Sequence, residues 1–157
     1  MLARLNGPRQ GRARCCMPAP NPLILVIREW LRKADNDLRN AAHTLTIGVD
    51  CPTDTVCFHA QQCIEKHIKA LLVFRATPFP RTHNITALRV LLPPRFRPHL
   101  DRKAQRLLTE YATVRRYPDL GPDITLTEAR RAVALARSVR REVRRHLPRA
   151  ALRRGSP

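Results

Sequence analysis

Apolar residues recur along the chain at intervals of three and four positions, the spacing that places them on one side of an α-helix. Five segments carry this pattern, and no segment shows the strict alternation that predicts a half-buried β-strand. The segments that we expect to be helical are residues 24–46, 54–74, 83–92, 98–117 and 126–147. The sequence therefore predicts an all-α fold, an up-and-down helical bundle of four long helices plus one short helix.

Glycine and proline residues separate these helices. Gly48 and Pro52 interrupt the chain between the first two helices, and Pro93 with Pro94 ends the third. Pro118 ends the fourth helix, because the residue before a proline is pushed out of the helical region. These breaks leave short connections, as expected for neighbouring helices in a bundle.

Two helices begin with residues that are typical caps. We expect Thr53 or Asp54 to be the N-cap of the second helix, because their side-chain oxygens can accept a hydrogen bond from the first turn. Thr125 and Glu128 have the spacing of a capping box, in which each side chain bonds the other residue's backbone N–H. The pair predicts that the fifth helix begins near residue 126.

The two ends of the chain lack this periodicity. Residues 1–22 mix Arg, Gly and Pro and are expected to be a disordered basic segment, and Met17 is an alternative translation start. Residues 148–157 are expected to be a basic disordered tail. The sequence therefore predicts one helical domain over residues 23–147.

The charge of the chain is unusual. Lys and Arg number 30 against 12 Asp and Glu, which gives a net charge of +18 and suggests affinity for polyanions. All but four of the basic residues are arginines, a bias that a GC-rich genome would also produce, so both explanations stay open. Aromatic residues make up only 4% of the chain, which argues against a platform that stacks several bases.

Cysteine content and hydropathy bear on the cellular compartment. The chain has an odd number of cysteines and no CxxC pair, so reduced thiols in the cytoplasm are expected rather than a disulfide framework. No apolar run approaches the roughly 18 residues that span a bilayer. LILVI at 23–27 is also too short for the core of a signal peptide. We therefore expect a soluble, cytoplasmic protein with no membrane partner.

The second helix contains the one stripe of potential metal ligands. His59, Cys63 and His67 are spaced by four residues, but the first and last would lie about 12 Å apart along the axis, too far for one ion. No second His/Cys cluster completes a site, so we predict neither a metal nor a cofactor. Cys57 and Cys63 are interpreted as small core residues rather than nucleophiles. No motif of a hydrolase or kinase is present, so no catalytic residue is assigned.

A series of short motifs identifies a resemblance to a known family. The motifs are WLRKADNDL at 30–38, CFHAQQCIEKHIKALL at 57–72, THNI at 82–85, YATVRRYPD at 111–119 and TLTEA at 125–129. Taken in this order they resemble the HEPN domain family, the higher eukaryote and prokaryote nucleotide-binding domain. The resemblance covers about 27–147 and implies a compact helical bundle with an additional short helix, in agreement with the pattern above.

The resemblance implies that polar side chains of the second helix are functional or structural rather than merely exposed. We expect them to form a polar seam with the fourth helix, because buried polar groups need hydrogen-bond partners. Cys63 and His67 stand where the family usually has small apolar residues. The candidates for the seam or for ligand binding are His59, Gln62, Glu65, Lys66, Lys69, His83, Tyr111, Arg115, Arg116 and Tyr117.

Many members of the family are ribonucleases with an Arg followed four to six residues later by a His, which would transfer a proton while the Arg stabilises negative charge. Arg115 and Arg116 are not followed by such a His, and Arg140 or Arg141 with His146 is interpreted as a chance match in an arginine-rich helix. The resemblance therefore favours the RYP-containing branch, whose members pair with a minimal nucleotidyltransferase.

The resulting expectation is a homodimeric HEPN-domain protein that pairs with a nucleotidyltransferase in a toxin–antitoxin-like system. It would bind a nucleotide or an RNA phosphate through Arg115, Arg116 and Lys69. Tyr111 and Tyr117 are interpreted first as core or helix-cap aromatics, and modification of one of them by the partner is the alternative. Two alternatives stay open: a metal-independent ribonuclease toxin with an atypical active site, and an interaction module without a ligand.

Overall fold

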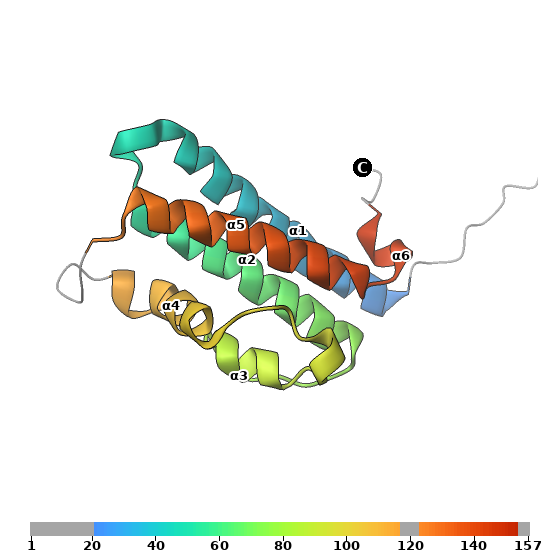
Figure 1. The fold of residues 1–157 in the computed structure, drawn as a ribbon. Coiled ribbons are helices and arrows are strands. Elements are labelled where there is room, and N and C mark those ends of the chain that lie inside the picture. The colour runs from blue at the N-terminus through green and yellow to red at the C-terminus, as the bar shows by residue number, and fades with distance from the viewer. Residues whose placement is uncertain (1–20, 117–122, 154–157) are drawn as a thin grey trace, which may run out of the picture.

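Helix α2 lies at the centre of the fold, and α1, α4 and α5 pack against it (Figure 1). The computed structural model describes residues 21–116 and 123–153. Within these ranges every regular element is a helix, and the all-α fold class is confirmed. The elements are α1 (Pro22–Thr44), η1 (Leu45–Asp50), α2 (Thr53–Phe74), α3 (Ile85–Val90), η2 (Pro94–Phe96), α4 (Arg102–Ala112), η3 (Val114–Arg116), α5 (Leu126–Arg145) and α6 (Arg149–Leu152), where η denotes a 3₁₀ helix.

The sequence of α2 explains its central position. Fourteen of its 22 residues are buried, so α2 is enclosed on most sides rather than along one stripe. Its largest apolar side chains, such as Ile64, Ile68 and Leu71, are fully buried. Each contributes about 1.5–3 kcal/mol relative to an exposed position. The buried polar residues of α2, which are Gln61, Gln62, Glu65, His67 and Lys69, therefore need partners inside the protein.

The other two longest helices are amphipathic, as their periodicity predicts. In α1, the buried stripe includes Ile27, Leu31 and Ala41, and this stripe packs along α2. In α5, the buried residues are Ala129, Ala132, Val133, Ala136, Val139 and Val143. The small residues of α5 pack on α2, and most of its arginines are exposed, but Arg140 and Arg144 are partly buried toward α1.

The N-cap residue predicted for α5 is confirmed, whereas the one predicted for α2 is not. Thr125 is the N-cap of α5, and its hydroxyl accepts a hydrogen bond from the backbone N–H of Glu128 at 3.2 Å. The prediction for α2 is wrong: Pro52 holds the N-cap position without a side-chain bond. Thr53 is the first helical residue, and its hydroxyl donates to the carbonyl of Ile124 at 2.6 Å. This bond fastens the start of α2 to the segment before α5.

The fourth helix is shorter than its periodicity predicts. Asp101 caps α4 by accepting a hydrogen bond from the N–H of Ala104 at 2.7 Å, so residues 98–100 lie before the helix. Leu100 is nevertheless buried. At the other end Thr113 leaves the helical region of backbone angles, and the chain continues as η3. The apolar spacing thus continues through non-helical residues.

Two residues adopt the left-handed backbone conformation at chain reversals. Gly48 has a φ of 86° within η1, a conformation that suits a residue without a Cβ. Ala76 has a φ of 49° just after α2. There the N–H of Ala76 bonds the carbonyl of Val73, and that of Thr77 bonds the carbonyl of Leu72, both at 3.0 Å. These bonds form a Schellman motif that ends α2.

The chain beyond α5 differs from the expected disordered tail. Residues Arg149–Leu152 form the short helix α6, which packs against α1 and buries Ala151. The guanidinium of Arg28 donates two hydrogen bonds, of 3.0 and 2.8 Å, to the carbonyl of Ala150. Residues 1–20, including Met17, and residues 154–157 lie outside the described part of the chain, and so does most of the predicted N-terminal segment.

In the described part of the chain, none of the helices combines the length and the apolar character that crossing a bilayer requires.

Candidate functional site

The candidate residues do not form one seam between α2 and α4. The structure describes the side chains of eight of the ten candidates and divides them among three clusters, each of which joins α2 or α4 to a different neighbour. We call them the Glu65 cluster, the Asp37 cluster and the Tyr111 cluster. This arrangement corrects the expected single recess.

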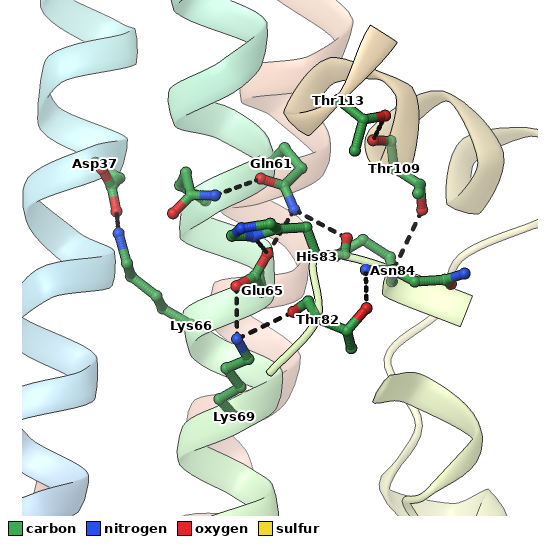
Figure 2. Close-up of polar contacts among 12 residues, drawn as sticks. Asp37, Gln61, Glu65, Lys66, Lys69, Thr82, His83, Asn84, Thr109 and Thr113 are labelled. Atoms are coloured by element: carbon green, nitrogen blue, oxygen red, sulfur yellow. Dashed lines mark hydrogen bonds and ion pairs between the residues drawn. The ribbon is translucent and has the colours of Figure 1, made fainter. Parts of the chain in front are cut away.

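The Glu65 cluster joins α2 to the segment that leads into α3 (Figure 2). Glu65 is 3% exposed and receives hydrogen bonds from Lys69 at 2.7 Å and from Gln61 at 2.8 Å. The Nδ1 atom of His83 lies 3.0 Å from the same carboxylate. Gln62 donates to the side-chain oxygen of Gln61 at 2.9 Å and extends the network along α2.

The network keeps the Glu65 carboxylate ionised. Burial opposes ionisation, but the hydrogen bonds from Lys69, Gln61 and His83 outweigh it and hold the pKa of Glu65 below its usual value. Lys69 also donates to the carbonyl of Thr82 at 3.2 Å, so its ammonium group contacts the chain on both sides. The cluster therefore fixes the segment before α3 onto α2.

Lys69 is enclosed by more than its polar partners. The residue is 8% exposed, and its ammonium lies 5.8 Å from the ring centres of both Trp30 and Phe79. These two rings meet edge to face, with centres 6.2 Å apart. A cation held in this way stabilises the packing of α1 and the segment before α3 on α2. It is not placed to bind a phosphate, which removes Lys69 from the expected ligand site.

The Asp37 cluster joins α2 to α1. Asp37 is 8% exposed, and the ammonium of Lys66 forms an ion pair with its carboxylate. The Nδ1 atom of His59 lies 2.9 Å from the other carboxylate oxygen. Because both side chains reach from α2 to one acid on α1, their arrangement is explained by helix packing.

The Tyr111 cluster joins α4 and η3 to α5. The hydroxyl of Tyr111 donates a hydrogen bond to Glu128 at 2.7 Å, and a guanidinium nitrogen of Arg115 lies 3.7 Å from the same carboxylate oxygen. Burial raises the pKa of Tyr111, and the neighbouring carboxylate raises it further, so the phenol stays protonated and remains a donor. This cluster contains two of the predicted residues and one, Glu128, that was expected only as a cap.

A pocket of about 590 Å³ opens beside this cluster. Its lining combines apolar residues of α4 and α5 with cations, carboxylates and hydroxyls. The lining residues are Asp101, Lys103, Ala104, Leu107, Leu108, Tyr111, Arg115, Thr125, Thr127, Glu128, Arg131, Ala132 and Leu135. An apolar wall with a few converging polar groups is the usual composition of a small-molecule site.

Two further candidates cannot be placed in the pocket. Arg116 belongs to η3, directly after Arg115, but its side chain is outside the described part of the structure. Tyr117 lies entirely outside the described residues.

The predicted core cysteines are buried and reduced. Cys57 and Cys63 are fully buried, and burial raises the pKa of each thiol to about 12. A thiol with so high a pKa is a poor nucleophile at neutral pH. Among residues 21–116 and 123–153, no three His, Cys, Asp or Glu side chains are grouped in a way that would hold a metal ion.

His67 is a buried residue that the sequence marked as part of a metal stripe and as a departure from the small apolar residue that is usual in the family. Its Nδ1 atom lies 2.8 Å from the carbonyl of Cys63, which can only accept, so Nδ1 carries the proton. The Nε2 atom has no hydrogen-bond partner within the described residues and lies 4.0 Å from Asp35. Burial lowers the pKa of His67 to about 4, and the imidazole is therefore neutral.

Arg140 and His146, which match the Arg–His spacing of the ribonucleases by chance, contact different neighbours. Arg140 bonds Asp35 at 2.7 Å on the α1 side of α5. His146, which caps α5, packs edge to face on Phe96 with ring centres 5.0 Å apart. Their contacts therefore account for both side chains without a shared cleft.

Sequence reasoning did not select three residues that organise these clusters: Gln61, Asp37 and Glu128. Asp37 carried a signal, because it falls three residues after Ala34 on the buried side of α1. Gln61 is spaced four residues before Glu65, the separation of neighbours on one helix face. Glu128 was recognised only for its capping-box spacing, and its second partner comes from a distant helix.

Comparisons with known proteins agree with this fold. A family model for the HEPN domain matches residues 27–146. The chain is similar to the crystal structure of TT1696 from Thermus thermophilus, with 30% identity and a TM-score of 0.64 over 77% of this chain and 98% of that one. It is also similar to ST0689, an archaeal HEPN homologue, with 25% identity and a TM-score of 0.57 over 76% and 96% of the two chains. A search of curated proteins found no match. From the extent of the family match and these two structures, the chain belongs to the HEPN domain family.

Proposed function

We propose that this HEPN protein acts as a homodimer that pairs with a minimal nucleotidyltransferase in a toxin–antitoxin-like system, and that it binds a nucleotide in the pocket between α4 and α5. The observation that carries the nucleotide site is the Tyr111 cluster, in which Arg115 lies beside Glu128 and lines a pocket of about 590 Å³. The family and the RYP sequence at 116–118 support the pairing.

The composition of the pocket suits the two parts of a nucleotide. Leu107 and Leu135 contribute to an apolar wall against which a base can lie. Lys103, Arg115 and Arg131 bring three cations to the lining, and guanidinium groups bind phosphate oxygens through paired hydrogen bonds. The volume also falls in the range of about 300–1,000 Å³ that is usual for ligand pockets.

The site differs from the one expected from the sequence. Lys69 is committed to Glu65 and to the carbonyl of Thr82, so it is replaced in this proposal by Arg131. Arg115 is retained, because its side chain lines the pocket and lies beside Glu128. Arg116 remains a prediction, since its side chain is outside the described structure.

Titration of the purified protein with ATP, followed by calorimetry, tests the nucleotide site. Arg131→Ala is expected to weaken ATP binding by about tenfold, the loss of one charge-assisted contact of roughly 1.5 kcal/mol. Arg130→Ala is the matched control, because Arg130 is exposed, adjacent and absent from the lining. No binding to the wild-type protein, or equal losses in the two variants, would reject the pocket as the nucleotide site.

Co-expression with a nucleotidyltransferase encoded beside the gene tests the pairing. We expect the two proteins to purify as one complex, and the isolated chain to have twice the mass of 18.0 kDa by light scattering. A monomer that does not associate with such a transferase would contradict the proposed assembly, whatever the result with ATP.

A further inference from the structure

A second hollow, which we call the arginine groove, lies between α1, α5 and α6 and has a volume of about 890 Å³. Among the described residues, seven arginines, six aliphatic residues and two acids, Glu29 and Asp35, line it. None of them lines the pocket between α4 and α5, so this surface is separate from the proposed nucleotide site. The excess of arginines over acids attracts a negatively charged ligand.

Most of these arginines form two rows, one on each of the two long helices that border the groove. The rows are Arg28, Arg32 and Arg39 on α1 and Arg137, Arg140 and Arg144 on α5. Within each row the side chains are three, four or seven residues apart, so they lie on one side of their helix. Because α1 packs on α5, a ligand between the two rows meets guanidinium groups on both of its sides.

The groove also presents aliphatic side chains. On α1, Leu38 and Ala42 are partly buried and, by helical spacing, lie between the buried stripe and the arginine row. Leu25 is 46% exposed, and Leu152 of α6 is partly buried. A ligand that carries only charge gains nothing from this surface, whereas an apolar side chain placed on it is removed from water. The lining therefore favours a ligand that is itself amphipathic.

The arginines of the groove already bind carboxylates of the protein. Two nitrogens of Arg32 donate to the two oxygens of Glu29 at 2.8 and 2.6 Å, which is a paired contact. Asp35 accepts hydrogen bonds from Arg140 at 2.7 Å and from Arg144 at 3.5 Å. Both acids are thus committed to arginines, and they orient guanidinium groups that have five N–H donors each. The groove therefore offers mainly donors, and the matching ligand supplies acceptors such as carboxylates.

Two arginines of the groove have no such partner. Arg137 and Arg153 are exposed, and neither side chain has a hydrogen-bond or ion-pair partner within the part of the chain that the structure describes. Arg153 follows α6, which lies beside the first part of α1, whereas Arg137 belongs to the middle of α5 (Figure 1). The groove thus has unpaired cations at separate places along its length.

We propose that the arginine groove binds an acidic amphipathic helix of a partner protein. On α1 the groove extends from Leu25 to Ala42, about 26 Å along the axis, which is the length of about 17 helical residues. Leucines of the partner, three and four residues apart, lie on the aliphatic part of the lining. Acids on the two sides of that apolar stripe meet the arginine rows of α1 and α5. Such a helix uses both parts of the lining, whereas a polyanion uses only its charge.

Fluorescence anisotropy with a labelled synthetic peptide tests the proposal. The probe is a helix-forming peptide of about 18 residues, with leucines at a spacing of three and four and glutamates on both sides of this stripe. A peptide of the same composition in shuffled order is the control for the apolar stripe. At about 0.15 M salt we expect the ordered peptide to bind roughly tenfold more tightly than the shuffled one.

A pair of double variants tests the contribution of charge. Arg137→Ala/Arg153→Ala is expected to bind the ordered peptide on the order of tenfold more weakly, because two unpaired guanidinium groups are lost. Arg102→Ala/Arg141→Ala is the control with the same change in net charge, since both residues are exposed and neither lines the groove.

A pair of leucine variants tests the apolar contribution without changing the charge. Leu25→Ser is expected to weaken binding of the ordered peptide about fivefold, because about half of the leucine side chain is available for burial. Leu23→Ser is the matched control, since Leu23 is 40% exposed on the same helix and does not line the groove. Circular dichroism of each variant verifies that it is folded.

The outcomes distinguish the acidic helix from unspecific attraction and from a polyanion. Losses in Leu25→Ser and in Arg137→Ala/Arg153→Ala, but not in their controls, support the proposal, and ATP binding should stay unchanged in both. Equal affinity for the ordered and shuffled peptides, or equal losses in the two double variants, would show that only net charge acts. Tighter binding of a polyphosphate chain than of the peptide, with no effect of Leu25→Ser, would assign the groove to a polyanion instead.

Discussion

The hydroxyl of Tyr111 on α4 and the carboxylate of Glu128 on α5 are joined by a hydrogen bond of 2.7 Å, and both residues line the pocket between these helices. Tyr111 is 4% exposed, so the bond is shielded from competing water. A guanidinium nitrogen of Arg115 lies 3.7 Å from the same carboxylate oxygen. The position of the Glu128 side chain therefore affects one of the cations that line the pocket. Because this hydrogen bond connects two helices, its contribution to the free energy of unfolding can be measured by substitution of either residue.

Replacing the phenol hydroxyl should weaken the contact between α4 and α5. We expect Tyr111→Phe to lower the free energy of unfolding by about 1 kcal/mol, the usual value for one hydrogen bond in a protein. Urea denaturation of Tyr111→Phe, Glu128→Gln and the double variant measures the coupling between the two side chains. Strictly additive effects in this cycle would show that the two groups do not interact.

Glu65 is expected to be among the most sensitive polar residues of the protein. Glu65→Gln leaves the ammonium of Lys69 buried without its carboxylate, and breaking a buried pair in this way costs about 3–5 kcal/mol. Thermal and urea denaturation would both detect such a loss.

Glu110→Gln provides the control for this prediction. Glu110 forms an ion pair of 3.7 Å with Arg106, also four residues apart, but the Arg106 side chain is 75% exposed. The expected loss is less than about 1 kcal/mol, because solvent screens exposed pairs. Similar losses in Glu65→Gln and Glu110→Gln would contradict the role assigned to the Glu65 cluster.

The C-terminus of α2 offers a substitution that should stabilise the protein. Ala76 has a left-handed φ of 49°, a conformation that costs an L-residue about 1–2 kcal/mol relative to glycine. Ala76→Gly is therefore expected to raise the free energy of unfolding by about 1 kcal/mol. Ala104→Gly, within α4, should lower it by a similar amount. A decrease for Ala76→Gly in urea denaturation would show that the Schellman motif is not formed in solution.

The sequence predicted the helices better than it predicted the partners of their side chains. The apolar stripes of α1 and α5 follow from spacing alone, because a helix with one apolar side has to bury it. The boundaries of α4 did not follow from spacing, since Leu100 is buried in a segment that precedes the helix. Periodicity identifies buried residues, but it does not distinguish a helix from an adjoining loop that packs on the same core.

The single seam expected between α2 and α4 was wrong for a reason that is visible in the spacing. His59 and Lys66 are seven residues apart and share one side of α2, where both contact Asp37. Glu65 and Lys69 are four residues apart and share another side, toward the segment before α3. The spacing separates the two stripes, but only the arrangement of the neighbouring helices determines which partner each stripe meets.

The neutral His67 should make the stability of the protein sensitive to mild acid. Its pKa is lowered from 6.5 to about 4 in the folded protein, so below pH 6.5 the unfolded chain binds the proton more readily. The contribution of His67 is complete above pH 6.5 and is lost as the pH falls toward 4, by about 3 kcal/mol in total. Urea denaturation at several pH values should therefore show a steeper decline over this range for the wild type than for His67→Leu. His43→Gln, at an exposed histidine, should retain the wild-type decline, and an unchanged slope in His67→Leu would mean that other groups cause it.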